Sequence, residues 1–90
     1  MNEIMIAITL IISAGEDAEA CNYYMSVMGT EAFEMAACER MDKNVDRVPE
    51  WMEKIEPHLE DYPEHWDDLG ESLSHQSEYV TRYLYLHGEM

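Results

Sequence analysis

The segment from residue 55 to residue 71 combines a dense acidic charge with residues that favour a folded core. It contains Leu59, Tyr62, Trp66 and Leu69, whose apolar surface can hold the segment against the rest of the chain. It carries seven carboxylates and no Lys or Arg: Glu56, Glu60, Asp61, Glu64, Asp67, Asp68 and Glu71. We therefore expect this segment to fold with its acids outward, which makes it the main candidate for a functional surface.

The length and charge of the chain limit both its architecture and its partners. Its 90 residues suit a single domain, and the apolar content of 47% is high enough for a core. With 20 acids against five bases, the net charge is −15. Nucleic-acid phosphates and anionic membranes repel such a chain, so we expect it to bind neither directly. Cations and basic protein surfaces are the partners that this charge attracts.

Residues 4–12 form the most apolar run of the sequence. The run is shorter than the roughly 20 residues that cross a bilayer. No Lys or Arg precedes Arg40, so the basic start of a signal peptide is missing and we expect none. The rest of the chain offers no second strand pattern. We therefore expect a buried helix or a dimer interface here, with a strand as the alternative.

Hydrophobic spacing and helix-terminating residues predict an all-α fold, a small bundle of four to five helices in one domain spanning residues 1–90. Beyond the apolar run, the expected helices are residues 16–28, residues 31–48, a short helix from Pro49, and a final helix from Pro63 to about residue 87. Ser13 and Glu16 have capping-box spacing, which either starts a helix or bends a continuous one at Gly15. The final helix is expected to be the longest, although Gly70 inside it costs on the order of 1 kcal/mol relative to alanine.

The two cysteines, Cys21 and Cys38, lie among alanines and lack the spacing of a redox or zinc motif. Cysteines in such surroundings are usually small buried hydrophobic residues. We expect two buried thiols, with a single disulfide as the alternative. Free thiols suit a reducing compartment, so a cytoplasmic location is expected.

The final helix carries a row of carboxylates. With about 100° of turn per residue, Glu64, Asp67, Glu71 and Glu78 project within one sector, and Asp68 lies beside it. The first three are separated by roughly 4.5–6 Å along the axis, similar to the phosphate spacing of a nucleic-acid strand. No Lys alternates with them, so like charges destabilise the helix by roughly a few tenths of a kcal/mol per pair. The apolar residues of this helix are expected opposite the row: Trp66, Leu69, Leu73, Val80 and Leu84.

This unfavourable charge row favours a functional role, with adaptation of the surface to high salt as the alternative. The predicted partner-binding surface extends the row across the Pro63 bend and back along the chain. Its members are Glu53, Glu56, Glu60, Asp61, Glu64, Asp67, Asp68, Glu71 and Glu78.

No motif for catalysis or metal binding appears. Ser72, Ser74 and Ser77 are helical neighbours of His75 but do not form a triad pattern or a G-x-S-x-G motif. The histidines match neither H-E-x-x-H nor the paired E-x-x-H pattern of di-iron bundles, and there is no EF-hand loop. We expect no enzymatic activity, no cofactor and no metal site, and a metal-binding bundle is the third hypothesis. The histidines concerned are His58, His65, His75 and His87.

In size, predicted helicity and charge, the whole chain resembles the small acidic phage proteins that imitate DNA, the anti-restriction and anti-CRISPR inhibitors. The resemblance includes no sequence motif. It implies a cytoplasmic inhibitor whose carboxylates replace phosphates in the basic nucleic-acid-binding site of a host defence protein, such as a CRISPR effector complex or a restriction enzyme. The alternative is an interaction or assembly protein, or an antitoxin-like neutraliser, that forms a homodimer through Ile4–Ile12.

Overall fold

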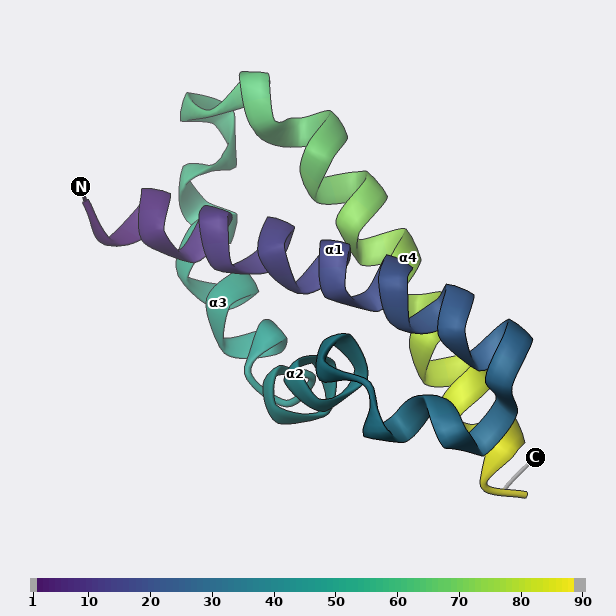
Figure 1. Cartoon of the computed structure of the whole chain (residues 1–90). Helices are drawn as coiled ribbons and strands as arrows, with labels where there is room; N and C mark the ends of the chain where they lie inside the picture. The colour runs from purple at the N-terminus through teal and green to yellow at the C-terminus, as the bar shows by residue number, and fades with distance from the viewer. Residues whose placement is uncertain (1, 89–90) are drawn as a thin grey trace.

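The computed structural model describes residues 2–88, which form an all-α fold (Figure 1). These residues contain four α-helices: α1 (Glu3–Met28), α2 (Ala36–Asn44), α3 (Val48–Ile55) and α4 (Trp66–Leu86). Three 3₁₀ helices connect them: η1 (Gly29–Glu34), η2 (Glu56–Asp61) and η3 (Pro63–His65). The predicted all-α class is confirmed, with four α-helices. The last helix is not the longest, because α1 has 26 residues and α4 has 21.

Helix α1 runs without interruption through both the apolar N-terminal run and the predicted break near Gly15. It begins where the Asn2 side chain accepts a hydrogen bond from the Met5 amide at 2.8 Å, and it ends before Gly29, whose φ is 62°. Ser13 lies inside α1 and starts no helix. The carbonyls of the preceding turn already accept the hydrogen bonds of the backbone amides that an N-cap side chain would otherwise satisfy. The strand alternative for residues 4–12 is therefore wrong. No helix within residues 2–88 combines the length and the apolar character needed to cross a membrane.

The predicted helix over residues 31–48 is divided into η1 and α2, which corrects the sequence interpretation, whereas the short helix predicted from Pro49 is present as α3. The chain first forms η1, and Met35 then adopts an extended conformation with ψ at 143°, which separates η1 from α2. Pro49 occupies the first turn of α3, where its missing amide costs no hydrogen bond. Inside a continuous helix, the same proline would lose the bond to the preceding turn, so the chain restarts instead.

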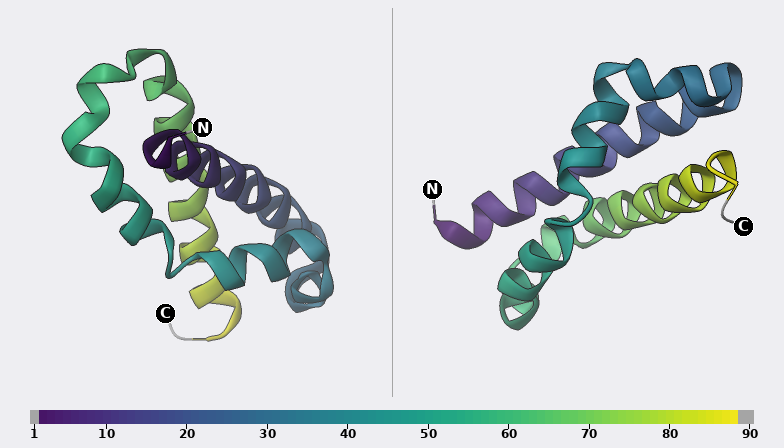
Figure 2. Two further views of the ribbon diagram at one scale, coloured as in Figure 1. Left: turned by 90° about the vertical axis from the view of Figure 1, so that its left-hand side faces the viewer. Right: turned by 90° about the horizontal axis from the view of Figure 1, so that it is seen from below.

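Helix α1 is the central element of the fold. It packs against α4, α2 and α3. Figures 1 and 2 show that α4 crosses α1, and that the chain passes through α2 and α3 to one side of this crossing. One apolar cluster includes Ala18 and Met41 near the α2 side, and a second includes Ile8, Ile55 and Leu69 near the start of α4. Both clusters depend on α1, whose N-terminal half buries Ile8 and Ile11 against its neighbours but leaves Ile6 and Leu10 exposed.

At the crossing of α1 and α4, the two backbones approach closely at Gly15 and Ser72. The Ser72 hydroxyl donates a hydrogen bond to the Ile11 carbonyl at 2.6 Å, and the Gln76 amide donates to the Ser72 hydroxyl at 2.9 Å. These polar side chains are buried with their hydrogen-bonding capacity used. The buried face of α4 is therefore rotated from the predicted apolar stripe. Trp66 and Val80, which were expected inside, are exposed.

The prediction of two free thiols is wrong, because Cys21 on α1 and Cys38 on α2 form a disulfide with Cα atoms 4.8 Å apart. Both residues are buried, as expected. The buried neighbours Ala18 and Ala37 are small enough to let the helices approach within the span of a disulfide. Disulfides persist mainly in oxidising compartments, so the cysteines give no support to the predicted reducing location.

Removing the disulfide by changing Cys21 and Cys38 together to alanine is expected to lower the free energy of unfolding by about 3 kcal/mol. The bridge joins positions 17 residues apart, and opening a loop of that length raises the entropy of the unfolded chain. Urea denaturation followed by circular dichroism measures the change. Reductant should destabilise the wild type by a similar amount and leave the double variant unaffected. Equal stability of wild type and variant without reductant would contradict the prediction.

Candidate functional site

All nine carboxylates of the predicted surface are exposed. They occupy α3 (Glu53), η2 (Glu56, Glu60, Asp61), η3 (Glu64) and α4 (Asp67, Asp68, Glu71, Glu78). In Figure 1 the chain rises from α3 through the two 3₁₀ turns and descends along α4, so the elements that carry these acids follow one another along the chain. The structure thus places the whole predicted set at the surface and on consecutive elements.

The turn region of this acidic segment is held by its apolar residues. The Trp66 indole donates a hydrogen bond to the Leu59 carbonyl at 2.7 Å, which closes the η2–η3 turn on itself. The Tyr62 hydroxyl accepts a hydrogen bond from the Asn2 side chain at 3.3 Å, and Leu59 and Tyr62 pack against the cluster around Ile55. The prediction that apolar residues pack this acidic segment on the core is confirmed for Leu59, Tyr62 and Leu69, whereas Trp66 is half exposed.

Few basic side chains neutralise the surface. Arg82 lies 3.1 Å from Glu78, so this carboxylate is paired, in contrast to the predicted row of unpaired acids. Within residues 2–88, no Lys or Arg lies within 4.0 Å of the other eight carboxylates. Lys54 pairs with Glu3, and Arg40 pairs with Asp17, whose hydrogen bond raises the pKa of the Arg40 guanidinium. Two of the five bases are thus paired with acids outside the predicted surface.

Helix α1 adds acids that the sequence interpretation missed. Glu16 and Glu19 line a hollow of about 150 Å³ together with Asp68 and Glu71 of α4. The close approach at Gly15 brings these groups together, because it lets the two helices cross with little space between them. In the sequence, the only signal was a glycine inside a helical pattern, next to an acid. The acidic surface therefore continues from α4 onto α1.

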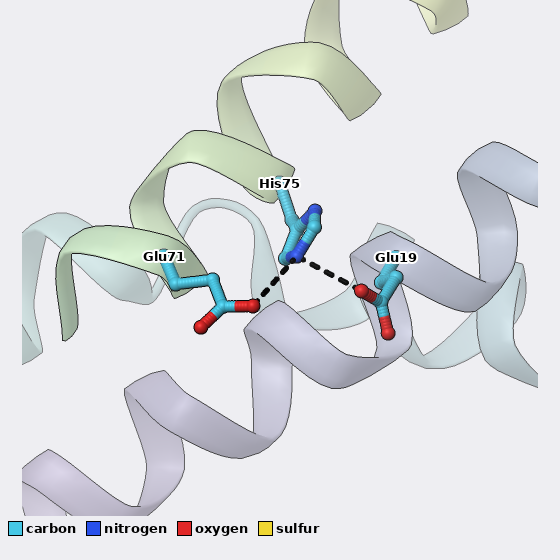
Figure 3. Close-up of side chains that lie close together, drawn as sticks. All are labelled: Glu19, Glu71 and His75. Carbon is cyan, nitrogen blue, oxygen red and sulfur yellow. Dashed lines mark ion pairs between the residues drawn. The ribbon is translucent and has the colours of Figure 1, made fainter. Parts of the chain in front are cut away.

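One histidine lies between two of these acids (Figure 3). The Nε2 atom of His75 is 3.0 Å from Oε2 of Glu19 and 3.8 Å from Oε1 of Glu71. The backbone carbonyl of His75 accepts a hydrogen bond from the Asn22 side chain at 3.1 Å, which links this turn of α4 to α1. Glu71 and His75 are helical neighbours four residues apart on α4, and the packing of α1 against α4 adds Glu19.

A second hollow, of about 360 Å³, lies near the C-terminal half of α4, lined by aromatic residues such as Phe33, Tyr79 and Tyr83. Burial raises the pKa of the Tyr79 phenol to about 12, with further contributions from nearby Asp42 and Tyr83. The phenol is therefore neutral at physiological pH and adds no charge to the hollow. These side chains pack against the core that contains the disulfide.

Comparisons with protein family models, with curated proteins and with solved structures found no match for this chain.

Proposed function

We propose that this protein is a non-catalytic inhibitor that occupies the basic nucleic-acid-binding site of a partner protein. The partner class is a host defence protein, such as a CRISPR effector complex or a restriction enzyme, in the host cytoplasm. The observation that supports this function is the set of nine exposed carboxylates on consecutive elements, eight of them without a Lys or Arg neighbour within residues 2–88. Glu16 and Glu19 extend the same surface onto α1.

The chemistry of this surface matches that of a nucleic-acid backbone. Lys and Arg side chains that bind phosphates also form charge-assisted hydrogen bonds with carboxylates. Carboxylates that have no basic neighbour in their own chain remain available to such a partner. The opposite charges accelerate association and make binding sensitive to salt. The salt dependence should be shallower than that of DNA, because a folded protein lacks the condensed counterions of a duplex.

A second function, assembly through the N-terminal half of α1, is supported by a different observation. Ile6 and Leu10 are 46% and 40% exposed, within the segment Ile4–Ile12 that was predicted to form a homodimer. Residues four apart lie side by side on a helix, so these two side chains together offer an apolar surface that a second copy could cover. The assembly hypothesis predicts that the chains remain associated at high salt, because salt screens charge pairs but does not weaken contacts between apolar side chains.

Capture of partners from a bacterial lysate distinguishes these two functions. Tagged protein is immobilised, loaded at low salt and eluted with a salt gradient, and a parallel sample is eluted with duplex DNA. We expect nucleic-acid-binding proteins that elute in moderate salt and are displaced by DNA. A partner that resists both salt and DNA, or a second copy of the chain alone, would contradict the proposed inhibition and support assembly.

A further inference from the structure

Three metal-ligand side chains from two helices converge at the α1–α4 crossing. Glu19 comes from α1, and Glu71 and His75 come from successive turns of α4, as Figure 3 shows. One ligand atom from each residue lies within 4.8 Å of the other two. Two carboxylates that face each other across an imidazole repel unless a cation lies between them.

The contact geometry is compatible with an ion between these atoms. His75 Nε2 is buried and forms no hydrogen bond within residues 2–88, although it is 3.0 Å from Glu19 Oε2. Two ligands of one tetrahedral Zn²⁺ ion are about 3.3 Å apart, given metal–ligand bonds of about 2.0–2.2 Å. The distances from Nε2 to Glu19 and Glu71, 3.0 and 3.8 Å, lie on either side of this value. Both glutamate side chains are mostly exposed and can rotate toward an ion.

A buried side chain beside the cluster provides an independent indication. Asn22 is only 6% exposed, and within residues 2–88 its Oδ1 atom has no hydrogen-bond partner. Its amide nitrogen donates to the His75 carbonyl, and the residue lines the same hollow of about 220 Å³ as Glu19 and His75. An unpaired buried acceptor is costly, and a water molecule on a metal ion would donate to it. Arg82 also lines this hollow; its Nη2 atom pairs with Glu78, and its Nε atom has no hydrogen-bond partner within residues 2–88.

We propose that Glu19, Glu71 and His75 bind one divalent transition-metal ion of the Zn²⁺ class, which bridges α1 and α4. Imidazole together with carboxylates selects this class, whereas Mg²⁺ and Ca²⁺ prefer oxygen ligands alone. The fourth position is taken by water, with Asn22 Oδ1 as its acceptor. Nearby Glu16 and Asp68, which line the adjoining hollow, add negative potential that attracts the cation.

Titration of the full chain with Zn²⁺ by isothermal calorimetry tests this site. The protein is first treated with chelator and kept free of reductant, so that the cysteines remain in their disulfide. We expect one ion per chain, and excess Mg²⁺ should not displace it. Glu19→Gln and His75→Ala should each weaken binding at least about tenfold, because each removes a ligand. Glu64→Gln is the matched control, since it removes the same charge beside His65, where residues 2–88 supply no third ligand.

Nuclear magnetic resonance of the wild type gives a second measurement that needs no variant. Zn²⁺ should shift the ring signals of His75 at one equivalent and leave those of His58 and His87 unchanged. Equal weakening by Glu19→Gln and Glu64→Gln would show diffuse attraction to an acidic chain and overturn the proposal. Unchanged binding by His75→Ala, unshifted His75 ring signals, or no binding would also overturn it.

Discussion

Replacing Gly15 with alanine is expected to lower the free energy of unfolding by about 3 kcal/mol, at the upper end of the usual cost of overpacking a core. A Cβ atom at this position would lie 2.5 Å from the Cα atom of Ser72 and overlap the Ser72 side chain. Backbone cannot yield as a flexible side chain does, so α1 and α4 must move apart. The Ser72–Ile11 hydrogen bond, at 2.6 Å, would be strained or lost with that movement.

The matched control is the same substitution at Gly70, which also lies inside a helix but whose added Cβ would meet nothing within 4 Å in residues 2–88 beyond its own chain neighbours and turn of helix. Gly70→Ala should raise the free energy of unfolding by up to about 1 kcal/mol, because alanine favours the helix over the unfolded chain. Urea denaturation of both variants measures the two changes. A stabilising Gly15→Ala, or equal effects at the two sites, would contradict the close helix crossing.

Changing Glu64, Asp67 and Glu71 together to lysine is expected to weaken binding of the captured partner at least about 100-fold. Removing one member of a buried, hydrogen-bonded charge pair costs about 2–5 kcal/mol, and reversal adds repulsion. The three side chains are exposed, so the fold should tolerate the change and the helical circular-dichroism signal should persist. Affinity is measured by surface plasmon resonance at several salt concentrations.

A second triple variant with the same change in net charge distinguishes the loss of contacts at the predicted surface from a general effect of net charge on binding. Glu31, Glu34 and Glu39 are exposed on η1 and α2, at the other end of the molecule from η2 and η3 in Figures 1 and 2. Changing these three to lysine should weaken binding much less, because long-range attraction falls while the contact residues remain. Equal losses from the two triple variants would remove the predicted surface from the mechanism.

The two proposals share Glu71, and the variants keep them distinguishable. His75→Ala removes a metal ligand and leaves in place the nine carboxylates of the predicted surface and its extension, Glu16 and Glu19. This variant should bind the partner as the wild type does in the presence of chelator. Failure of metal binding would therefore leave the proposed inhibition unaffected, and loss of inhibition in the triple lysine variant would not depend on an ion.

Local chemistry explains what the sequence determined. Helical spacing of apolar residues predicts helices wherever the pattern is long, and proline predicts where a helix must restart, as Pro49 shows at α3. Charge density with interspersed aromatic residues predicted an acidic segment that is both folded and exposed, and all nine predicted surface acids are exposed. These properties depend on residues that are close together in the chain, so they can be predicted from the sequence.

Contacts between distant residues were decided only by the tertiary structure. The Cys21–Cys38 disulfide, the continuity of α1 through Gly15, and the meeting of Glu19 with His75 all depend on which helices pack together. Two helices cross where their side chains leave room, and Gly15 provides that room opposite Ser72. A glycine inside a helical pattern is equally consistent with a bend or a close approach until its partner is known. The exposure of the individual acidic residues could therefore be predicted from the sequence, whereas the arrangement of Glu19 and Glu71 around His75 could not, because it depends on how α1 and α4 pack.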